Sequence, residues 1–284
     1  MRLRRTHVRR LWEWLRTTIY SLLSRSRTVG RVAVHLRRAT THQIRYRLVR
    51  SMEADENGES WFISLVASQV ETAFDVGANV GRWSEDVLRS CPNLRSLSCF
   101  EPSEAATITM VAAIGSDARV RIVRAAVSDA EGSMSFYEQP NASQTSSLVS
   151  TASRDAIERS VRVVTLDQEM ENLGLDHLDL LEIDVEGYDL HALRGVRSAL
   201  SRQAISFVQF EYNQPWMYAG STLQAAARLL DECDYELFLL NSSGLCKCDV
   251  SRLGELFAYL NFVAIPRRQI DHLPIDINPD PLWG

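Results

Sequence analysis

From residue 61 onward, the chain alternates between short apolar runs and longer stretches with apolar residues at helical spacing. The runs predict strands, and the stretches between them predict helices. Because single helices separate most of the runs, the pattern indicates crossover connections and a parallel sheet with helices on both faces. This is an α/β fold in three layers. We expect strands at 72–76, 96–100, 120–127, 178–183, 206–212, 235–240 and 257–265.

The first fifty residues have a different pattern. On a helical wheel, residues 9–24 place leucine, isoleucine and tryptophan on one broad arc and mainly arginine, threonine and serine on the other, which is typical of an amphipathic helix. The sequence leaves three roles open for this helix. It could dock on the rest of the protein or stay unstructured, contact an anionic membrane surface, or contact nucleic acid.

Charge divides the chain into an arm and a body. Residues 1–50 contain fourteen arginines and one acid, Glu13, whereas the remaining residues carry 17 basic and 35 acidic side chains, a net charge of −18. An acidic body disfavours nucleic acid as a substrate, because phosphate binding needs a basic surface. We expect an arginine-rich N-terminal arm and linker at 1–60, the α/β domain at 61–270 and a C-terminal tail at 271–284.

The composition of the 284 residues, 45% hydrophobic and 24% charged, excludes a largely disordered or fibrous protein. No apolar run approaches the roughly 18 residues that a membrane-spanning helix needs. Five irregularly spaced cysteines are too few for a disulfide framework and indicate a reducing compartment. We therefore expect a cytoplasmic protein, with peripheral membrane contact through residues 9–24 as an option. The sequence predicts no particular oligomeric state.

Candidate chemistry follows two of the predicted strands. Asp75, Gly77 and Gly81 lie in the turn after the first strand, and Glu101 ends the second. In an open parallel sheet, ligands bind at these carboxyl ends, and Glu101 can accept both hydrogens of a ribose diol. The G-x-x-x-G spacing lacks the middle glycine of a dinucleotide site, and Asp75 opposes a pyrophosphate. The turn suits the cationic groups of S-adenosylmethionine; an NAD site and a turn without ligand are the alternatives.

Longer segments carry a further pattern, namely DVGANVG at 75–81, FEP at 100–102, AVSDAEG at 126–132, TLD at 165–167 and LLEIDVEGYDLHALRG at 180–195. With FEYN at 210–213 and the terminal LNFVAI, they resemble the FkbM family of S-adenosylmethionine-dependent methyltransferases over roughly residues 70–265. The resemblance implies a class I methyltransferase (Rossmann-like) fold with a mostly parallel seven-stranded sheet. It also implies methyl transfer to a hydroxyl oxygen of a saccharide, glycolipid or natural product.

The resemblance further implies where the cofactor lies. The turn after the first strand would face its methionine half, Glu101 would hold its ribose, and Ala126 and Asp129 would border its adenine. The residues of that turn are Asp75, Gly77, Asn79 and Gly81. Glu182 departs from the family, which commonly has lysine at this position. Any functional role of that lysine would be lost here, whereas a lysine that only caps a strand beside solvent would have no consequence.

A sugar hydroxyl is a poor nucleophile that benefits from positioning and from a base or a metal. Asp184, Glu186 and Glu211 follow two of the predicted strands and are the candidate catalytic residues. Asp184 and Glu186 could instead only cap the following helix. Asp184, Glu211 and Asn213 together offer oxygen ligands for magnesium or calcium, an alternative that stays open although we expect no metal.

Asn213, Trp216 and Tyr218 are the candidate residues for acceptor binding, the two aromatic rings because they pack on sugars. The Ser/Thr-rich loop at 141–153, with QTSSL at 144–148, is longer than an ordinary connection and favours a lid or acceptor loop. We expect an S-adenosylmethionine-dependent O-methyltransferase for a small-molecule or glycan acceptor. The alternatives are an NAD-type oxidoreductase and an inactive methyltransferase-fold scaffold docked through its basic arm.

Overall fold

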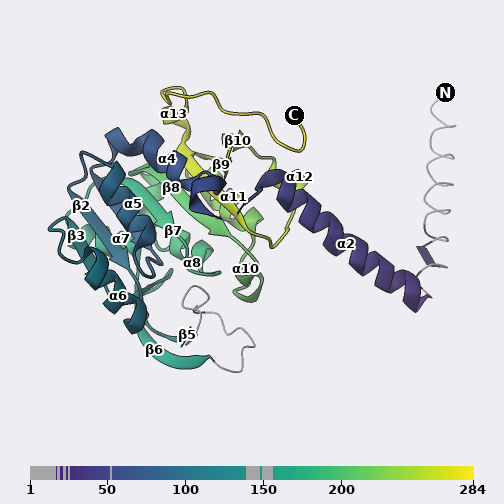
Figure 1. Cartoon of the computed structure of the whole chain (residues 1–284), viewed down its shortest axis with the longest axis horizontal. Helices are drawn as coiled ribbons and strands as arrows, with labels where there is room; N and C mark the ends of the chain where they lie inside the picture. Colours follow the sequence, from purple (N-terminus) through teal and green to yellow (C-terminus); the bar gives the residue numbers. More distant parts are fainter. Residues whose placement is uncertain are drawn as a thin grey trace. The chain divides into compact units, whose positions relative to one another are not determined.

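The computed structural model describes residues 17, 20–21, 24, 26–51, 53–138, 148 and 156–284 (Figure 1). It contains two compact units, Met1–Tyr46 and Arg47–Gly284. Most of the expected amphipathic segment at 9–24 lies outside the described residues, as does the loop at 141–153 with its QTSSL segment, apart from Leu148. The first unit contains most of one long helix, α2 (Arg27–Leu48).

The second unit is built around an eight-stranded sheet. In spatial order its strands are β10 (Gly244–Lys247), β9 (Tyr235–Asn241), β11 (Leu260–Pro266), β8 (Ile205–Tyr212), β7 (Leu178–Ile183), β1 (Thr72–Val76), β2 (Ser96–Phe100) and β3 (Val120–Val123). Five neighbouring strands of this sheet are parallel, namely β8, β7, β1, β2 and β3. The next strand, β11, pairs antiparallel with both β8 and β9. The strand order reverses at β1, so the carboxyl ends of β1 and its neighbours form the crevice where ligands bind in such sheets.

Helices cover both faces of this sheet and give the three expected layers. Apolar side chains of α4 (Glu59–Val66), α5 (Arg82–Ser90) and α6 (Glu104–Ile114) pack in one core with the strands. The strands β1, β2 and β3 progress toward one edge of the sheet, whereas β7, β8 and β9 progress toward the other edge. Right-handed crossovers therefore put α8 (Asp189–Arg194) and α11 (Leu223–Glu232) on the opposite face from α5 and α6. The other helical segments are α3 (Ala54–Asn57), η1 (Ala67–Gln69), α7 (Leu166–Asn172), α9 (Arg197–Ser201), α10 (Pro215–Tyr218), α12 (Val250–Leu253) and α13 (Arg267–Ile270).

A separate sheet of three strands lies in the order β4 (Ala126–Val127), β6 (Ile157–Val164) and β5 (Gly132–Glu138). The expected strand at 120–127 is therefore two strands that belong to different sheets. The chain leaves the main sheet after Val123, where the Ala125 amide donates to the Val123 carbonyl at 2.9 Å.

The main sheet corrects the expected number of strands from seven to eight. The additional strand is β10, which pairs with β9 at the edge of the sheet. It is four residues long and follows a tight turn, and Gly244 at its start has a φ of +103°. Such a short edge strand has no clear apolar alternation, so the sequence pattern does not predict it. Of the helices described, none is long and apolar enough to cross a membrane.

Candidate active site

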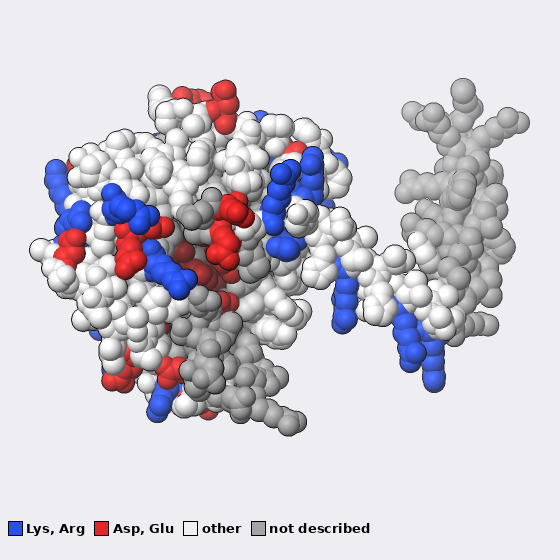
Figure 2. All heavy atoms as spheres, viewed as in Figure 1, with Lys and Arg blue, Asp and Glu red and all other residues white. Residues whose placement is uncertain are grey.

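A cavity of about 630 Å³ opens at the carboxyl ends of β1, β2, β7 and β8. In Figure 2, acidic side chains gather in the hollow at the middle of this face of the second unit. Among the described lining residues nine are acidic, and Arg82 is the one basic side chain. The nine acids are Glu53, Glu59, Asp75, Asp86, Glu101, Glu182, Asp184, Glu186 and Glu211. The cavity is therefore strongly acidic and suits a cationic ligand.

The turn after β1 is held against both neighbouring strands. The Gly77 and Ala78 amides donate to the Phe100 carbonyl at the end of β2, at 2.9 and 3.1 Å. On the other side, the Asp184 amide donates to the Val76 carbonyl at 2.8 Å. Gly77 has a φ of +93°, and a β-carbon at this position would collide with the Asp184 carbonyl. Only glycine fits here, which keeps this part of the turn free of side chains.

Gly81 precedes α5 directly and lies next to α6. Its φ is +89°, and a β-carbon there would lie 2.9 Å from the Met110 side chain of α6. Gly81 does not belong to the cavity lining. This glycine therefore allows α5 to start close to α6.

Glu101 follows β2 directly and is 6% exposed. Its Oε2 accepts the Asn79 amide at 2.9 Å, and its Oε1 accepts the Ser103 amide at 2.7 Å. Burial raises the pKa of Glu101 to about 7, although these two hydrogen bonds lower it. Each carboxylate oxygen keeps a lone pair that can accept a ligand hydroxyl. Asn79 adopts a positive φ of 47°, and its buried Oδ1 has no hydrogen-bond partner in the described chain.

Asp75 and Glu182 are neighbours on adjacent strands, in register between β1 and β7. Asp75 is 1% exposed, and the Ser84 hydroxyl donates to its Oδ2 at 2.5 Å. Burial raises the pKa of Asp75 to about 6, and it raises the pKa of Glu182 further because Asp75 and Asp184 repel its charge. Glu182 lines the cavity and is 6% exposed. Glu182, which stands where the family commonly has lysine, therefore places a buried acid in the cavity and not at a solvated strand end.

Three carboxyl groups and an amide lie together after β7 and at the end of β8. The Asn213 amide nitrogen donates to Glu211 at 2.6 Å and to Glu186 at 3.0 Å. Asp184 lines the same cavity, and its buried Oδ1 has no hydrogen-bond partner among the residues that the structure describes. Burial raises the pKa of Asp184, and repulsion from Glu211 and Glu186 raises it further. The site thus holds a carboxyl oxygen ready to bind a hydroxyl group.

The model of the methyltransferase FkbM domain matches residues 75–237, which is more than half of the chain. The chain belongs to the FkbM methyltransferase family. Hexuronic acid methyltransferase AglP of Haloferax volcanii is 26% identical over 185 residues, which cover 63% of this chain and 70% of that protein.

Two solved methyltransferase structures are similar to the chain. The methyltransferase FkbM of Methylobacillus flagellatus has 14% identity and a TM-score of 0.44, over 69% of this chain and 44% of that one. The chain thus matches less than half the length of that relative. Precorrin-6y C5,15-methyltransferase of Geobacter metallireducens has 12% identity and a TM-score of 0.40, over 73% and 87% of the two chains.

The family identifies this FkbM methyltransferase as a class I enzyme that depends on S-adenosylmethionine. The described residues fit this cofactor. The acidic lining matches its sulfonium and ammonium charges, Gly77 leaves room for close approach, and the unpaired Oδ1 of Asn79 can accept a hydrogen bond. The family match favours this cofactor over NAD.

Asn213 turns its nitrogen to Glu186 and Glu211, since an amide oxygen there would face two acceptors. In this arrangement the Asn213 nitrogen, and not its oxygen, faces the two carboxylates. Within the described ranges, no group of three or more histidine, cysteine, aspartate or glutamate residues is placed to hold a metal ion.

Three residues of the cavity escaped the sequence-based interpretation of the FkbM methyltransferase. Glu59 of α4 accepts hydrogen bonds from Asn261 at 2.8 Å and from Gln209 at 3.3 Å. The Asn261 side-chain nitrogen also donates a hydrogen bond to the Tyr259 hydroxyl at 3.1 Å. Trp83 lies in the first turn of α5, and its buried Nε1 has no acceptor among the described residues. Only Trp83 carried a local signal, because it follows the glycine turn by two residues.

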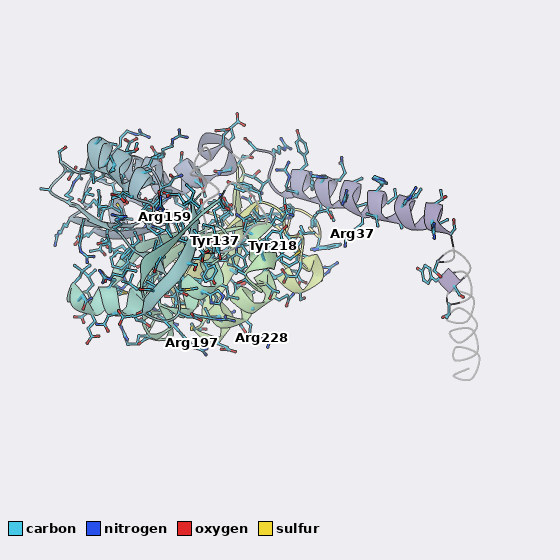
Figure 3. The ribbon with its side chains drawn as sticks, turned by 90° about the horizontal axis from the view of Figure 1, so that it is seen from below. Arg37, Tyr137, Arg159, Arg197, Tyr218 and Arg228 are labelled. Atoms are coloured by element: carbon cyan, nitrogen blue, oxygen red, sulfur yellow. The ribbon has the colours of Figure 1, made fainter. Side chains whose placement is uncertain are left out.

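The structure does not bring every expected residue to the cavity. Ala126 lines it, whereas Asp129 lies elsewhere and bonds His191 Nδ1 at 3.2 Å. Trp216 is completely buried, and its Nε1 donates to the Glu211 carbonyl at 3.0 Å, so no ring face is left for a sugar. Tyr218, labelled in Figure 3, is 53% exposed and lies outside the cavity lining. We leave Asp129, Trp216 and Tyr218 out of the proposed site.

We expect the protein without cofactor to become less stable as the pH rises from 5 to 8. Burial raises the pKa of Glu101 and of Glu186 to about 7 from an ordinary value of 4.5. Between these values the folded protein binds more protons than the unfolded chain, so the free energy of unfolding falls with rising pH. Because a change of one in pKa corresponds to about 1.4 kcal/mol, the melting temperature should drop measurably.

Differential scanning calorimetry across this range tests the expectation. The Glu101→Gln variant should lose less stability than the wild type over the same pH range, because the amide does not titrate. A melting temperature that stays constant or rises between pH 5 and 8 would contradict the assignment of raised pKa values to these carboxyls.

Proposed function

We propose that this FkbM methyltransferase methylates a hydroxyl group of a saccharide, with Asp184 as the general base. The observation that carries the proposal is the buried Oδ1 of Asp184, which lines the cavity and has no partner within the described chain. AglP, the relative with 26% identity, is a hexuronic acid methyltransferase and supports a sugar as acceptor. Hydroxyl groups are weak nucleophiles, so a base close to the reacting oxygen accelerates the transfer.

The cofactor half of the proposed site lies around the turn after β1. Glu101 would accept the two ribose hydroxyls, and Asp75 with Glu182 would offset the positive charge of the methionine end. Trp83 Nε1 would donate to the cofactor carboxylate. Ala126 and Val127, with Phe136 and Leu148, line the apolar part of the cavity and would border the adenine. When bound, S-adenosylmethionine supplies a methyl group activated by its sulfonium.

Asp184 lines the cavity between the turn after β1 and the two carboxyl groups of Glu186 and Glu211. Its amide is tied to β1 through Val76, so its position relative to the turn is fixed. Burial and the neighbouring carboxylates raise its pKa, which makes its carboxylate a stronger base. Asn213 holds Glu186 and Glu211 in one arrangement by donating to both. We assign Glu186 and Glu211 to acceptor binding beside the base.

The acidic lining also bears on the class of sugar. A hexuronate would bring a further carboxylate into a cavity lined by nine acids and one arginine, and each ionised acid there would repel it. We therefore propose an uncharged hexose or deoxyhexose unit as acceptor. This differs from the substrate in the name of AglP, and sugars of both kinds belong in the test.

The experiment measures methyl transfer from labelled S-adenosylmethionine to methyl hexosides and methyl hexuronides. We expect product with the uncharged sugars and, for Asp184→Asn, a kcat about 10²–10⁴-fold lower with little change in cofactor affinity. Asp86→Asn is the matched control, because Asp86 lines the same cavity but pairs with Arg89 at 2.5 Å. Full activity of Asp184→Asn would overturn the base assignment. Transfer to hexuronides alone would overturn the acceptor class and leave methyl transfer standing.

A further inference from the structure

We infer that helix α2 (Arg27–Leu48) is a docking surface for an anionic lipid bilayer and lies in the plane of the membrane surface. The inference concerns the first unit of the chain and is independent of the acceptor proposed above. It rests on how apolar and basic side chains divide around the described helix, on their exposure and on their charge.

One face of α2 is a stripe of apolar side chains. Val29, Val32, Ala33 and Leu36 follow the spacing i, i+3, i+4 and i+7, so they lie on one side of the helix, and Ile44 extends the stripe. Every residue of α2 from Arg27 to Arg38 is exposed. Val32 and Leu36 have 50% and 61% of their surface in solvent. The stripe from Val29 to Ile44 is about 22 Å long, at about 1.5 Å per residue.

The opposite face is a row of arginines. At 100° per residue, Arg27, Arg31, Arg38 and Arg45 fall within about 40° of one another, on the side away from the apolar stripe. The helix contains six arginines, two histidines and no acidic residue. Three residues depart from this division: Arg37 borders the apolar stripe, Arg47 falls in line with it, and Val34 lies beside the arginine row. A helix with mainly arginines on one face and mainly valine, leucine and isoleucine on the other matches anionic headgroups above an apolar acyl layer.

The second unit offers no matching cover for a stripe of this length within its described surface. Its exposed large apolar residues are spread over different elements, as Trp61, Ile157, Leu173 and Trp283 are. Ile108 and Val111 on α6, and Met217 and Tyr218 on α10, lie in pairs, but each pair spans no more than a single turn and covers only a short patch. Nucleic acid would satisfy the arginines and leave the valines and Leu36 in water. A bilayer accounts for both faces, so we commit to it.

The test is co-sedimentation of the full-length protein with two kinds of vesicle, phosphatidylcholine alone and phosphatidylcholine in which phosphatidylglycerol replaces a third of the lipid. We expect strong binding to the anionic vesicles only, and a loss of binding in high salt because salt screens the arginines. The affinity of the variant R31S/R38S/R45S for the anionic vesicles should be lower by a factor of about ten or more. V32S/L36S should also bind more weakly, because the apolar contact is lost.

The matched control is R194S/R202S/R228S, which removes three arginines from the second unit and should bind like the wild type. Calorimetry with S-adenosylmethionine checks that each variant is folded. Equal binding of the wild type and R31S/R38S/R45S would overturn the inference, as would no binding to either vesicle. Binding to duplex RNA that depends on Arg31, Arg38 and Arg45 but not on Val32 and Leu36, without vesicle binding, would assign the helix to nucleic acid instead.

Discussion

Glu101→Gln should lower the affinity for S-adenosylmethionine by about a hundredfold, since at least two hydrogen bonds to a charged group are lost or weakened. Glu101 has two tasks in the proposed site. It would accept the ribose hydroxyls, and it already fixes the turn by accepting the Asn79 and Ser103 amides. A glutamine nitrogen would face one of these amides or a ribose hydroxyl, so the new side chain cannot satisfy the same donors.

Isothermal titration with S-adenosylmethionine, S-adenosylhomocysteine and NAD measures this effect. Glu104→Gln is the matched control. It lies three residues further on, on α6, with 65% of its side chain exposed and in an ion pair with Arg124, so its removal should leave affinity unchanged. Unchanged affinity of Glu101→Gln would remove Glu101 from the cofactor site. Absence of cofactor binding by the wild type would move support to an inactive scaffold.

Gly77→Ala should destabilise the protein by about 3 kcal/mol or more and abolish cofactor binding, because backbone strain and a steric clash add at this position. The alanine β-carbon would have to occupy the place of the Asp184 carbonyl. Relief of that clash would separate β1 from β7 just below the proposed base. The effect therefore reaches stability and the site together.

Gly174→Ala separates the two causes. Gly174 also has a positive φ, +64°, but a β-carbon there meets no described atom within 4 Å. Its replacement should cost only the backbone strain, about 1 kcal/mol. Denaturant unfolding of both variants gives the comparison. If the two substitutions cost the same, the close approach between Gly77 and Asp184 does not constrain the site.

The apolar pattern located the edge of the sheet at which the cavity opens. Asp75 lies near the carboxyl end of β1, and Gly77 and Glu101 directly follow β1 and β2, whose carboxyl ends meet at that edge. The order of the elements and the three layers could be predicted for the same reason. The edge strand β10 could not, since its four residues lack a period of their own.

Side-chain direction was beyond the sequence. Trp216 follows Pro215 in the short helix α10, and only the fold determines that its ring packs against Phe210 and Tyr212 and not toward the cavity. Glu59 and Tyr259 reach the cavity from positions 200 residues apart in the chain. Long-range contacts of this kind leave no local pattern, which is why Glu59 and Tyr259 were not among the residues predicted from the sequence.

The lining of the cavity comes partly from the segment that matches the family and partly from the segments before and after it. The turn after β1, Glu101 and Asp184 lie within the segment that matches the family, whereas Glu53, Glu59 and Tyr259 lie before and after it. Mutations in the flanking segments can therefore alter one wall of the cavity without touching the residues proposed to hold the methyl donor. Divergence of the flanks can therefore reshape one wall of the cavity, while Glu186 and Glu211, which we assign to acceptor binding, stay within the matched segment.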